Sequence, residues 1–246
     1  MTEIYPAVKR LEDPRLLRGE AQFVADLRRS DALHMAVFRS PYAHARMRRL
    51  DVEAARQSPG VVMVLTAEDL ADTFPMPASE VPQPDFARAV SLMLRETEVR
   101  VLASDRLRYI GEPVAVVVAE SRPIAEDARD LIELEAEPLP PVSGQSALSG
   151  TQLYDDVPNN LAISMSFERG EKPADKPAVT VRGRFYSCRQ GGSPLENRGA
   201  LAEADPASAT VTLWTSTQVP HRVRKSVTTI LGWPEDRVRV ITPDVG

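Results

Sequence analysis

The sequence predicts an α+β protein made of two successive parts, of which the second stops inside a domain. Three observations support this prediction. Residues 109–141 show a strand, a helix and a second strand in close succession. The stretch 138–149 is rich in Pro, Ser and Gly, which is typical of a domain boundary. Beyond this boundary, strand patterns are grouped around one helix, and the chain ends directly after the last strand.

The residues before 109 predict short strands and helices. Residues 33–39 and 61–65 are mainly apolar, as expected for buried strands. Asp51 is placed to cap a short helix, and Thr66 with Asp69 has the spacing of a capping box at the start of another. The other expectations here are an extended lead-in at 1–15, a surface excursion at 71–88, a short helix or turn at 90–94 and a strand at 99–102.

The unit at 109–141 is the clearest pattern in the chain. Residues 113–119 form an almost unbroken apolar run rich in Val, which is typical of a strand buried on both faces. Ser121 is suited to cap the helix that follows, and Pro123 is tolerated in its first turn. Residues 132–136 alternate apolar and acidic side chains, which predicts a half-exposed strand. With the earlier elements, this unit predicts a mixed sheet covered by helices.

The second part predicts antiparallel strands followed by a helix and one more strand. A helix is expected to begin near Pro220 and to end at Gly232, with an apolar stripe between them. The expected strands are 179–185, 199–204, 210–215 and 238–241. The predicted division is a lead-in at 1–15, a first domain at 16–141, a linker at 142–160 and an incomplete second domain at 161–246.

Composition and charge narrow the function. A net charge of −5 argues against nucleic acid as a partner. We interpret the three basic residues Arg46, Arg48 and Arg49, called the basic trio below, as part of a solvent-exposed face. No apolar run is long enough to span a membrane. Cys188 is the only cysteine, which is consistent with a reducing, cytoplasmic location, and we interpret it as a structural thiol. His34, His44 and His221 are too isolated in sequence to form a metal cage, so no metal ligand is expected.

Several ordered motifs resemble one family. They are LEDPRLLRGEAQFVADL (11–27), FRSPYAHAR (38–46), PGVVMVLTAEDL (59–70), the block at 109–141, SPLENRGALAEADP (193–206) and LWTSTQVPH (213–221). All are similar to the molybdopterin-binding large subunit of the xanthine dehydrogenase, aldehyde oxidase and aerobic carbon monoxide dehydrogenase family. The resemblance implies an α/β hammerhead domain, followed by the start of a molybdenum-cofactor-binding domain.

The resemblance also implies an oxidoreductase. Members of this family oxidise an aldehyde, an N-heterocycle or carbon monoxide, with water as the oxygen source, at a molybdenum held by molybdopterin. For a bacterial enzyme the cytosine dinucleotide form of this cofactor is expected. The implied partners are an iron–sulfur subunit, an FAD subunit and the polypeptide that carries the rest of the molybdopterin domain.

Two residues match cofactor-binding positions of the family. Gln218 corresponds to a glutamine placed beside the oxo ligand of molybdenum, where an amide donates a hydrogen bond without adding charge. Gly246 corresponds to the first glycine of the family's cofactor loop. We interpret Glu196 as a loop carboxylate or salt-bridge partner, and Arg198 as a member of a structural ion pair rather than a phosphate ligand. The family's general-base glutamate has no counterpart here, so no catalytic residue is assigned.

Three interpretations follow from the resemblance. The first is the N-terminal portion of a molybdenum hydroxylase large subunit, inactive by itself because the base and most cofactor contacts are absent. The second is one chain of a split enzyme that another polypeptide completes. The third, from a different functional class, is a non-catalytic docking or assembly module.

Overall fold

The computed structural model describes residues 10–77, 92–95, 97–168, 170, 179, 181–188 and 190–246. These residues form two compact units. Unit 1 contains the described residues up to 30 together with 190–228 and 233–246, and unit 2 contains those between 31 and 188 together with 229–232. Unit 1 therefore joins the lead-in to the second half of the sequence. The expected surface excursion lies outside the described residues beyond 77.

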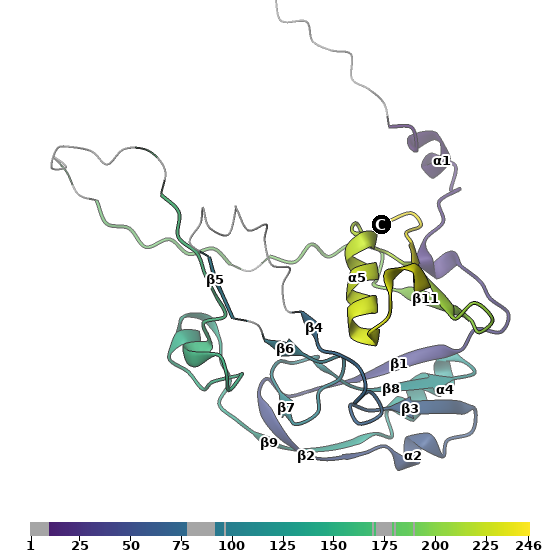
Figure 1. Ribbon diagram of the computed structural model, residues 1–246, viewed down its shortest axis with the longest axis horizontal. Coiled ribbons are helices and arrows are strands. Elements are labelled where there is room, and N and C mark those ends of the chain that lie inside the picture. Colours follow the sequence, from purple (N-terminus) through teal and green to yellow (C-terminus); the bar gives the residue numbers. More distant parts are fainter. Residues whose placement is uncertain are drawn as a thin grey trace, which may run out of the picture. The chain divides into compact units, whose positions relative to one another are not determined.

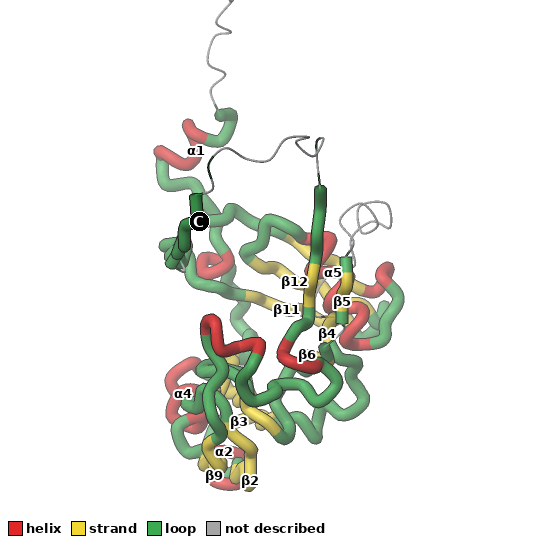
Figure 2. The backbone as a smooth tube through the Cα atoms, turned by 90° about the vertical axis from the view of Figure 1, so that its left-hand side faces the viewer, coloured by secondary structure: helices red, strands yellow, loops and turns green. Residues whose placement is uncertain are grey.

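Unit 2 contains a first antiparallel sheet with the strand order β1-β8-β3 (Figure 1), of which Figure 2 labels strand β3. Its strands are β1 (His34–Arg39), the central β8 (Pro113–Ala119) and β3 (Val61–Leu65). Helix α4 (Arg122–Arg129) packs against β1 and β8, and α2 (Glu53–Arg56) packs against β3. This arrangement confirms the predicted strand and helix of the block at 109–141.

A second antiparallel sheet has the order β7-β2-β9. Its strands are β7 (Arg106–Leu107), β2 (Ala45–Asp51) and β9 (Glu133–Pro138). The two principal sheets of unit 2 are thus both antiparallel, and the expectation of a mixed sheet is wrong. Strand β2 was not predicted, because three of its seven residues are arginines and its apolar residues therefore do not form a clear alternating pattern.

The basic trio lies on this β2 strand and is balanced by the acidic face of β9. Arg48 forms an ion pair with Glu137, and Arg49 lies 3.2 Å from Glu135. A bulge between Met47 and Arg49 interrupts the register at this point. These exposed cross-strand pairs confirm the interpretation of the trio as a solvated face.

The core of unit 2 is built around β8, as the valine-rich run predicts. Ala115 and Val117 are fully buried in a cluster with Val64 and residues of both helices. Val114, also fully buried, belongs to a different cluster with Leu107 of β7. Successive side chains of a strand point to opposite faces, so β8 is buried on both faces.

Two predicted helices take other forms. Thr66 and Asp69 close a turn instead of starting a helix, because both the N–H and the hydroxyl of Thr66 donate to Asp69 Oδ2, at 2.7 and 2.8 Å. Of the helix or turn expected at 90–94, residues 90 and 91 lie outside the described part and Met93–Leu94 is the strand β5. Strand β5 pairs with β10 (Ile163–Ser164), and β4 (Met76–Pro77) pairs with β6 (Glu98–Val99).

Unit 1 contains a sheet with the order β11-β12-β13. Strand β11 (Ala200–Asp205) forms an antiparallel pair with β12 (Thr210–Thr215), whereas β12 pairs in parallel with β13 (Val238–Ile241). Helix α5 (Pro220–Leu231) connects the two parallel strands. The positions of β12, α5 and β13 and the antiparallel pairing of β11 with β12 were predicted, whereas no direction was predicted for β13, which the structure shows to be parallel to β12. The remaining helices are α1 (Asp13–Leu17) and the 3-10 helices η1 (Val24–Asp26) and η4 (Glu235–Arg237).

The strand expected at 179–185 is also wrong for its described residues. Residues 179 and 181–185 have no assigned secondary structure. Their apolar side chains are open to solvent, with Val181 87% and Phe185 96% exposed. Apolar residues alternate along this stretch as predicted, but no strand among the described residues pairs with it.

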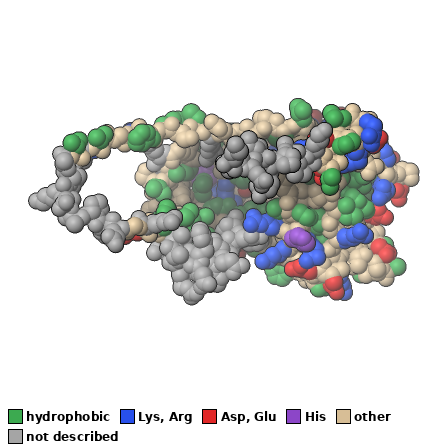
Figure 3. All heavy atoms as spheres, turned by 90° about the horizontal axis from the view of Figure 1, so that it is seen from above, with side chains coloured by type: hydrophobic (Ala, Val, Ile, Leu, Met, Phe, Trp, Pro, Cys, Tyr) green, Lys and Arg blue, Asp and Glu red, His purple; other side chains and the backbone are tan. Residues whose placement is uncertain are grey.

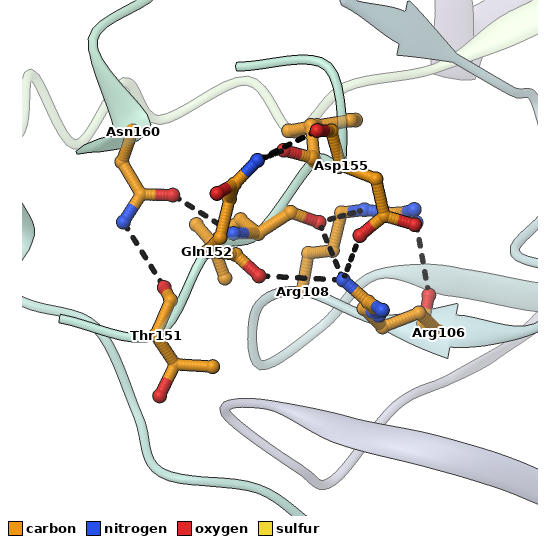
Figure 4. A network of polar contacts seen from close by, with 8 residues as sticks. Arg106, Arg108, Thr151, Gln152, Asp155 and Asn160 are labelled. Carbon is orange, nitrogen blue, oxygen red and sulfur yellow. Dashed lines mark hydrogen bonds and ion pairs between the residues drawn. The ribbon is translucent and has the colours of Figure 1, made fainter. Parts of the chain in front are cut away.

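The region predicted as a linker is held together by side-chain hydrogen bonds (Figure 4). It contains the 3-10 helices η2 (Gly144–Leu148) and η3 (Pro158–Asn160). The Asn160 amide donates to the carbonyls of Ala147 and Thr151 at 2.8 and 3.0 Å, and its oxygen accepts the Leu153 N–H at 2.8 Å. Arg106 of β7 reaches the same region, donating to the Gln152 and Leu153 carbonyls, each at 3.3 Å.

We expect Asn160→Ala to lower the free energy of unfolding by about 2 kcal/mol, because it removes three hydrogen bonds and leaves their backbone partners unpaired. Asn159→Ala is the matched control, since Asn159 has nearly the same positive φ, 56° against 55°, without these bonds. Urea denaturation of both variants separates the cost of losing the side-chain hydrogen bonds from the cost of placing alanine at a positive φ. Equal destabilisation would show that backbone strain, not the Asn160 side chain, dominates.

Candidate functional site

The topology of unit 1 brings three chain segments to one edge of its sheet. Strands β12 and β13 are parallel, with Trp214 opposite Ile241, so the segments that follow them leave at the same edge. Strand β11 is antiparallel to β12 and begins at Ala200, opposite Thr215, so the segment before it arrives there too. Carboxyl edges of parallel strands are where α/β sheets commonly bind ligands.

Gln218 lies at this edge, in the bend between β12 and α5. Its side chain is exposed and has no hydrogen-bond partner among the described residues. The Thr217 hydroxyl accepts the Val219 N–H at 3.1 Å and shapes the bend. The structure therefore places the predicted amide with its donor and acceptor both free to contact a ligand.

Gly246, the second predicted residue, lies at the end of the segment that follows β13. Its N–H donates to Glu196 Oε2 at 2.7 Å. A Cβ at this position would lie 2.7 Å from the Glu196 Cβ, so only glycine fits so close. The other oxygen, Glu196 Oε1, is buried and has no partner among the described residues. Glu196 is thus a loop carboxylate that holds main chain, one of its two expected roles.

Asp244 makes a second set of contacts that holds the same segment. The Arg15 guanidinium donates to both carboxylate oxygens, at 2.6 and 2.7 Å, and the Gln22 N–H donates to Oδ2 at 2.8 Å. The Asp244 N–H in turn donates to the Gln22 carbonyl at 2.9 Å. We call this group of contacts the Asp244 clamp. It ties Arg15 and Gln22, near the start of the chain, to the segment after β13, and the motif resemblance alone did not indicate it.

The hydrogen bonds from Arg15 and from the Gln22 backbone lower the pKa of Asp244 to about 2. The folded-state pKa is depressed, so the clamp's contribution to stability is fully present above the unfolded pKa of about 4 and is lost as the pH falls through about 2. We expect ¹³C NMR titration of the side-chain carboxyl to give this value. In Arg15→Met the pKa should move toward its ordinary value. An unchanged pKa in that variant would contradict the assignment to Arg15.

Basic side chains lie near the start of α5, next to Gln218. His221, Arg222 and Lys225 are exposed there. Figure 3 shows basic and acidic side chains interspersed on the face in view. Arg198 is exposed as well, and it makes no ion pair with a described residue, so the structural ion pair expected for it is not seen. The charged side chains of Arg198, Arg222 and Lys225 give this region a positive character that suits an anionic ligand.

A second candidate is a cavity of about 530 Å³ within unit 2, which sequence reasoning did not find. Tyr154 lies on its wall, with the Arg108 guanidinium 4.5 Å from the centre of the Tyr154 ring. Glu112 Oε2 accepts a hydrogen bond from the backbone N–H of Arg108 at 2.5 Å, and burial raises the pKa of Glu112 and that of Tyr154. These groups mainly satisfy one another, so we interpret the cavity as part of the scaffold of unit 2.

The described residues contain no cluster of three or more His, Cys, Asp or Glu side chains placed to hold a metal ion. His44 is buried and its Nδ1 lies 2.9 Å from the Pro140 carbonyl, whereas Cys188 is exposed. In the same part of the chain, none of the helices has the length and apolar character needed to cross a bilayer.

Two family models match the sequence. The first, described as the aldehyde oxidase and xanthine dehydrogenase a/b hammerhead domain, matches residues 18–140. The second, described as the molybdopterin cofactor-binding domain, matches residues 153–246. The second match includes every residue of the edge described above except those of the lead-in.

Individual proteins are similar over nearly the whole chain. The nicotine 6-hydroxylase large subunit of Paenarthrobacter nicotinovorans is 35% identical over 97% of this chain, and the carbon monoxide dehydrogenase large chain of Hydrogenophaga pseudoflava is 32% identical over 96%. The solved structure of quinoline 2-oxidoreductase from Pseudomonas putida 86 has a TM-score of 0.80 and 36% identity over 98%. The chain spans 29%, 30% and 30% of their respective lengths.

Proposed function

Since this chain belongs to the aldehyde oxidase and xanthine dehydrogenase family, of which it carries the hammerhead domain and the start of the molybdopterin-binding domain, we propose that it contributes one wall of a molybdenum-cofactor site. The activity proposed for the complete enzyme is oxidation of an aldehyde, an N-heterocycle or carbon monoxide, with water as the oxygen source. The names of the relatives, which include a nicotine hydroxylase and a quinoline oxidoreductase, favour an N-heterocycle.

The convergence of Gln218, Gly246 and Glu196 at one edge of the β11-β12-β13 sheet is the observation that supports this proposal. The residues fit a pterin cofactor. Gln218 offers a free amide, and Glu196 keeps one buried oxygen without a donor, which matches the N–H groups of a pterin. When bound, the cofactor supplies the two-electron redox chemistry, and this chain's residues bind and orient it.

We propose that the chain does not turn over substrate by itself. No carboxylate is positioned beside Gln218 by a contact among the described residues, and the chain spans about 30% of each relative. The exposed apolar side chains of Val181, Phe185 and Tyr186 support the need for further polypeptide to cover them. Completion by another polypeptide, as in a split enzyme, is compatible with the same features.

The finer parts of the proposal concern the cofactor form and the partners. We propose the cytosine dinucleotide form of molybdopterin, with an iron–sulfur subunit and an FAD subunit as electron carriers, in the cytoplasm. The relatives support subunit partners, because their names describe a large subunit and a large chain. The exposed cations at the start of α5 suit an anionic cofactor.

The test is to purify the 246-residue chain alone, and also co-expressed with a polypeptide that supplies the rest of a family large subunit. Molybdenum is measured by elemental analysis and pterin by fluorescence of its oxidised form. We expect substoichiometric cofactor in the chain alone and stoichiometric cofactor in the completed subunit. Tight, stoichiometric cofactor with turnover in the chain alone would overturn the proposal of an incompetent fragment.

The docking-module alternative predicts a different result. In that case the chain binds the iron–sulfur or FAD subunit of a relative but never acquires molybdenum, even when the completing polypeptide is present. A cofactor-free, stable complex of this kind would favour an assembly role over a catalytic one.

A further inference from the structure

We propose that Glu196 is a positioning residue for the cofactor, because its carboxylate fixes the turn after β13 and offers its second oxygen to an N–H donor of the loaded site. This inference rests on the proposed function, since it concerns the same edge of the sheet. Neither the motif resemblance nor the comparisons assign Glu196 a role.

The first observation is the contact with Gly246. A distance of 2.7 Å between the Gly246 nitrogen and Glu196 Oε2 is typical of a strong, charge-assisted hydrogen bond. The carboxylate can approach this closely only because position 246 has no Cβ. Position 246 therefore needs a glycine because of the contact with Glu196, whether or not the cofactor also approaches the backbone there.

The second observation is the free oxygen. Glu196 Oε1 is buried and has no partner among the described residues. Buried carboxylate oxygens are almost always hydrogen-bonded, because leaving one unpaired is costly. An ionised carboxylate only accepts, so the missing partner must be a donor, and the pterin ring and the main chain both provide N–H donors.

The third observation is that the main chain near Glu196 is held in place by its neighbours. The segment before β11 reaches the edge because Ala200 pairs with Thr215, and the Thr215 hydroxyl donates to the Gly199 carbonyl at 3.0 Å. Gly199 in turn packs closely, since a Cβ there would lie 3.2 Å from Val24 Cγ1. The main chain that carries Glu196 is thus held by neighbouring elements, so the carboxylate is directed rather than free to rotate away.

The experiment compares three variants with the wild type. Glu196→Ala removes both acceptors. Glu196→Gln keeps one acceptor and places an NH₂ group where the second oxygen was. Glu203→Gln is the matched control, since Glu203 also carries a carboxylate in unit 1 but contacts Arg29 on the exposed face of β11. None of these changes introduces a side chain larger than the one it replaces.

Hydrogen exchange of the Gly246 amide, followed by NMR on the 246-residue chain without cofactor, is the first readout. We expect exchange several-fold faster in Glu196→Ala and close to the wild type in Glu196→Gln and Glu203→Gln. Molybdenum and pterin content of the completed subunit is the second readout. There, both Glu196 variants should lose cofactor during gel filtration at least several-fold faster, whereas Glu203→Gln should retain it.

The two sources of the second donor are distinguished by the same variants. If Glu196→Gln loses cofactor while cofactor-free exchange is unchanged, the donor belongs to the loaded site, as proposed. If Glu196→Gln retains cofactor like the wild type, the role of Oε1 is refuted. Unchanged Gly246 exchange in Glu196→Ala would refute the hold on the turn. If even the wild-type completed subunit lacks molybdenum, the proposed function fails, while the exchange result still decides the contact with Gly246.

Discussion

Val117→Asp is expected to unfold unit 2. Val117 is fully buried on β8, between Ala36 of β1 and Val64 of β3. A carboxylate at this position has no hydrogen-bond donor on the surrounding Val, Ala and Ile side chains. Burying it unpaired costs at least about 4 kcal/mol, which approaches the lower end of the roughly 5–15 kcal/mol that stabilises an ordinary domain. Loss of the cooperative thermal transition in circular dichroism is the measurement.

Val62→Asp is the matched control, because Val62 is on the adjacent strand β3 and is 49% exposed. We expect its free energy of unfolding to change by less than about 1 kcal/mol. If both variants unfold alike, charge on the sheet rather than burial is responsible. If neither unfolds, the central position of β8 in the core is wrong.

Gln218→Ala is expected to reduce kcat of the completed enzyme about 100-fold, the usual cost of removing one hydrogen-bond donor directed at a reacting centre. Because Gln218 is exposed and makes no hydrogen bond to described residues, the stability of the 246-residue chain should change by less than about 0.5 kcal/mol. Steady-state kinetics and thermal denaturation together separate these effects.

Gln218→Glu tests the donor specifically, since it preserves the shape of the side chain and removes its NH₂ group. We expect it to be at least as impaired as Gln218→Ala. Gln57→Ala, at the exposed end of α2, is the control that should keep full activity. Equal activity of Gln218→Glu and the wild type would exclude a role for the amide as donor.

Much of the fold could be predicted where local patterns are strong. Strands β8, β3, β12 and β13 have the predicted bounds, because apolar runs of this kind admit few alternatives. Pairing was less predictable. The parallel register of β12 with β13 depends on α5 returning the chain to the same end of the sheet. Strand order and direction are tertiary properties that a pattern along the chain does not encode.

The site was predictable only in part, and for a physical reason. Gln218 and Gly246 came from motif resemblance, and the sheet topology gives them a common edge. The contribution of Glu196 could not be read from the sequence, because it depends on a contact between residues 50 positions apart. The same is true of Arg15 and Asp244, which are separated by 229 positions. A short sequence pattern does not indicate contacts between residues that lie so far apart in the chain.

The separation of Arg15 from Asp244 has a consequence for biosynthesis. Almost all of unit 2 is one continuous stretch, whereas unit 1 needs both the lead-in and the residues after β13. During translation, the hammerhead core has nearly all its polypeptide long before Asp244 leaves the ribosome. The Arg15 guanidinium must therefore remain without its carboxylate partner until all the residues between positions 15 and 244 have been synthesised. The order of translation thus favours early folding of the hammerhead and makes closure of the clamp a late step.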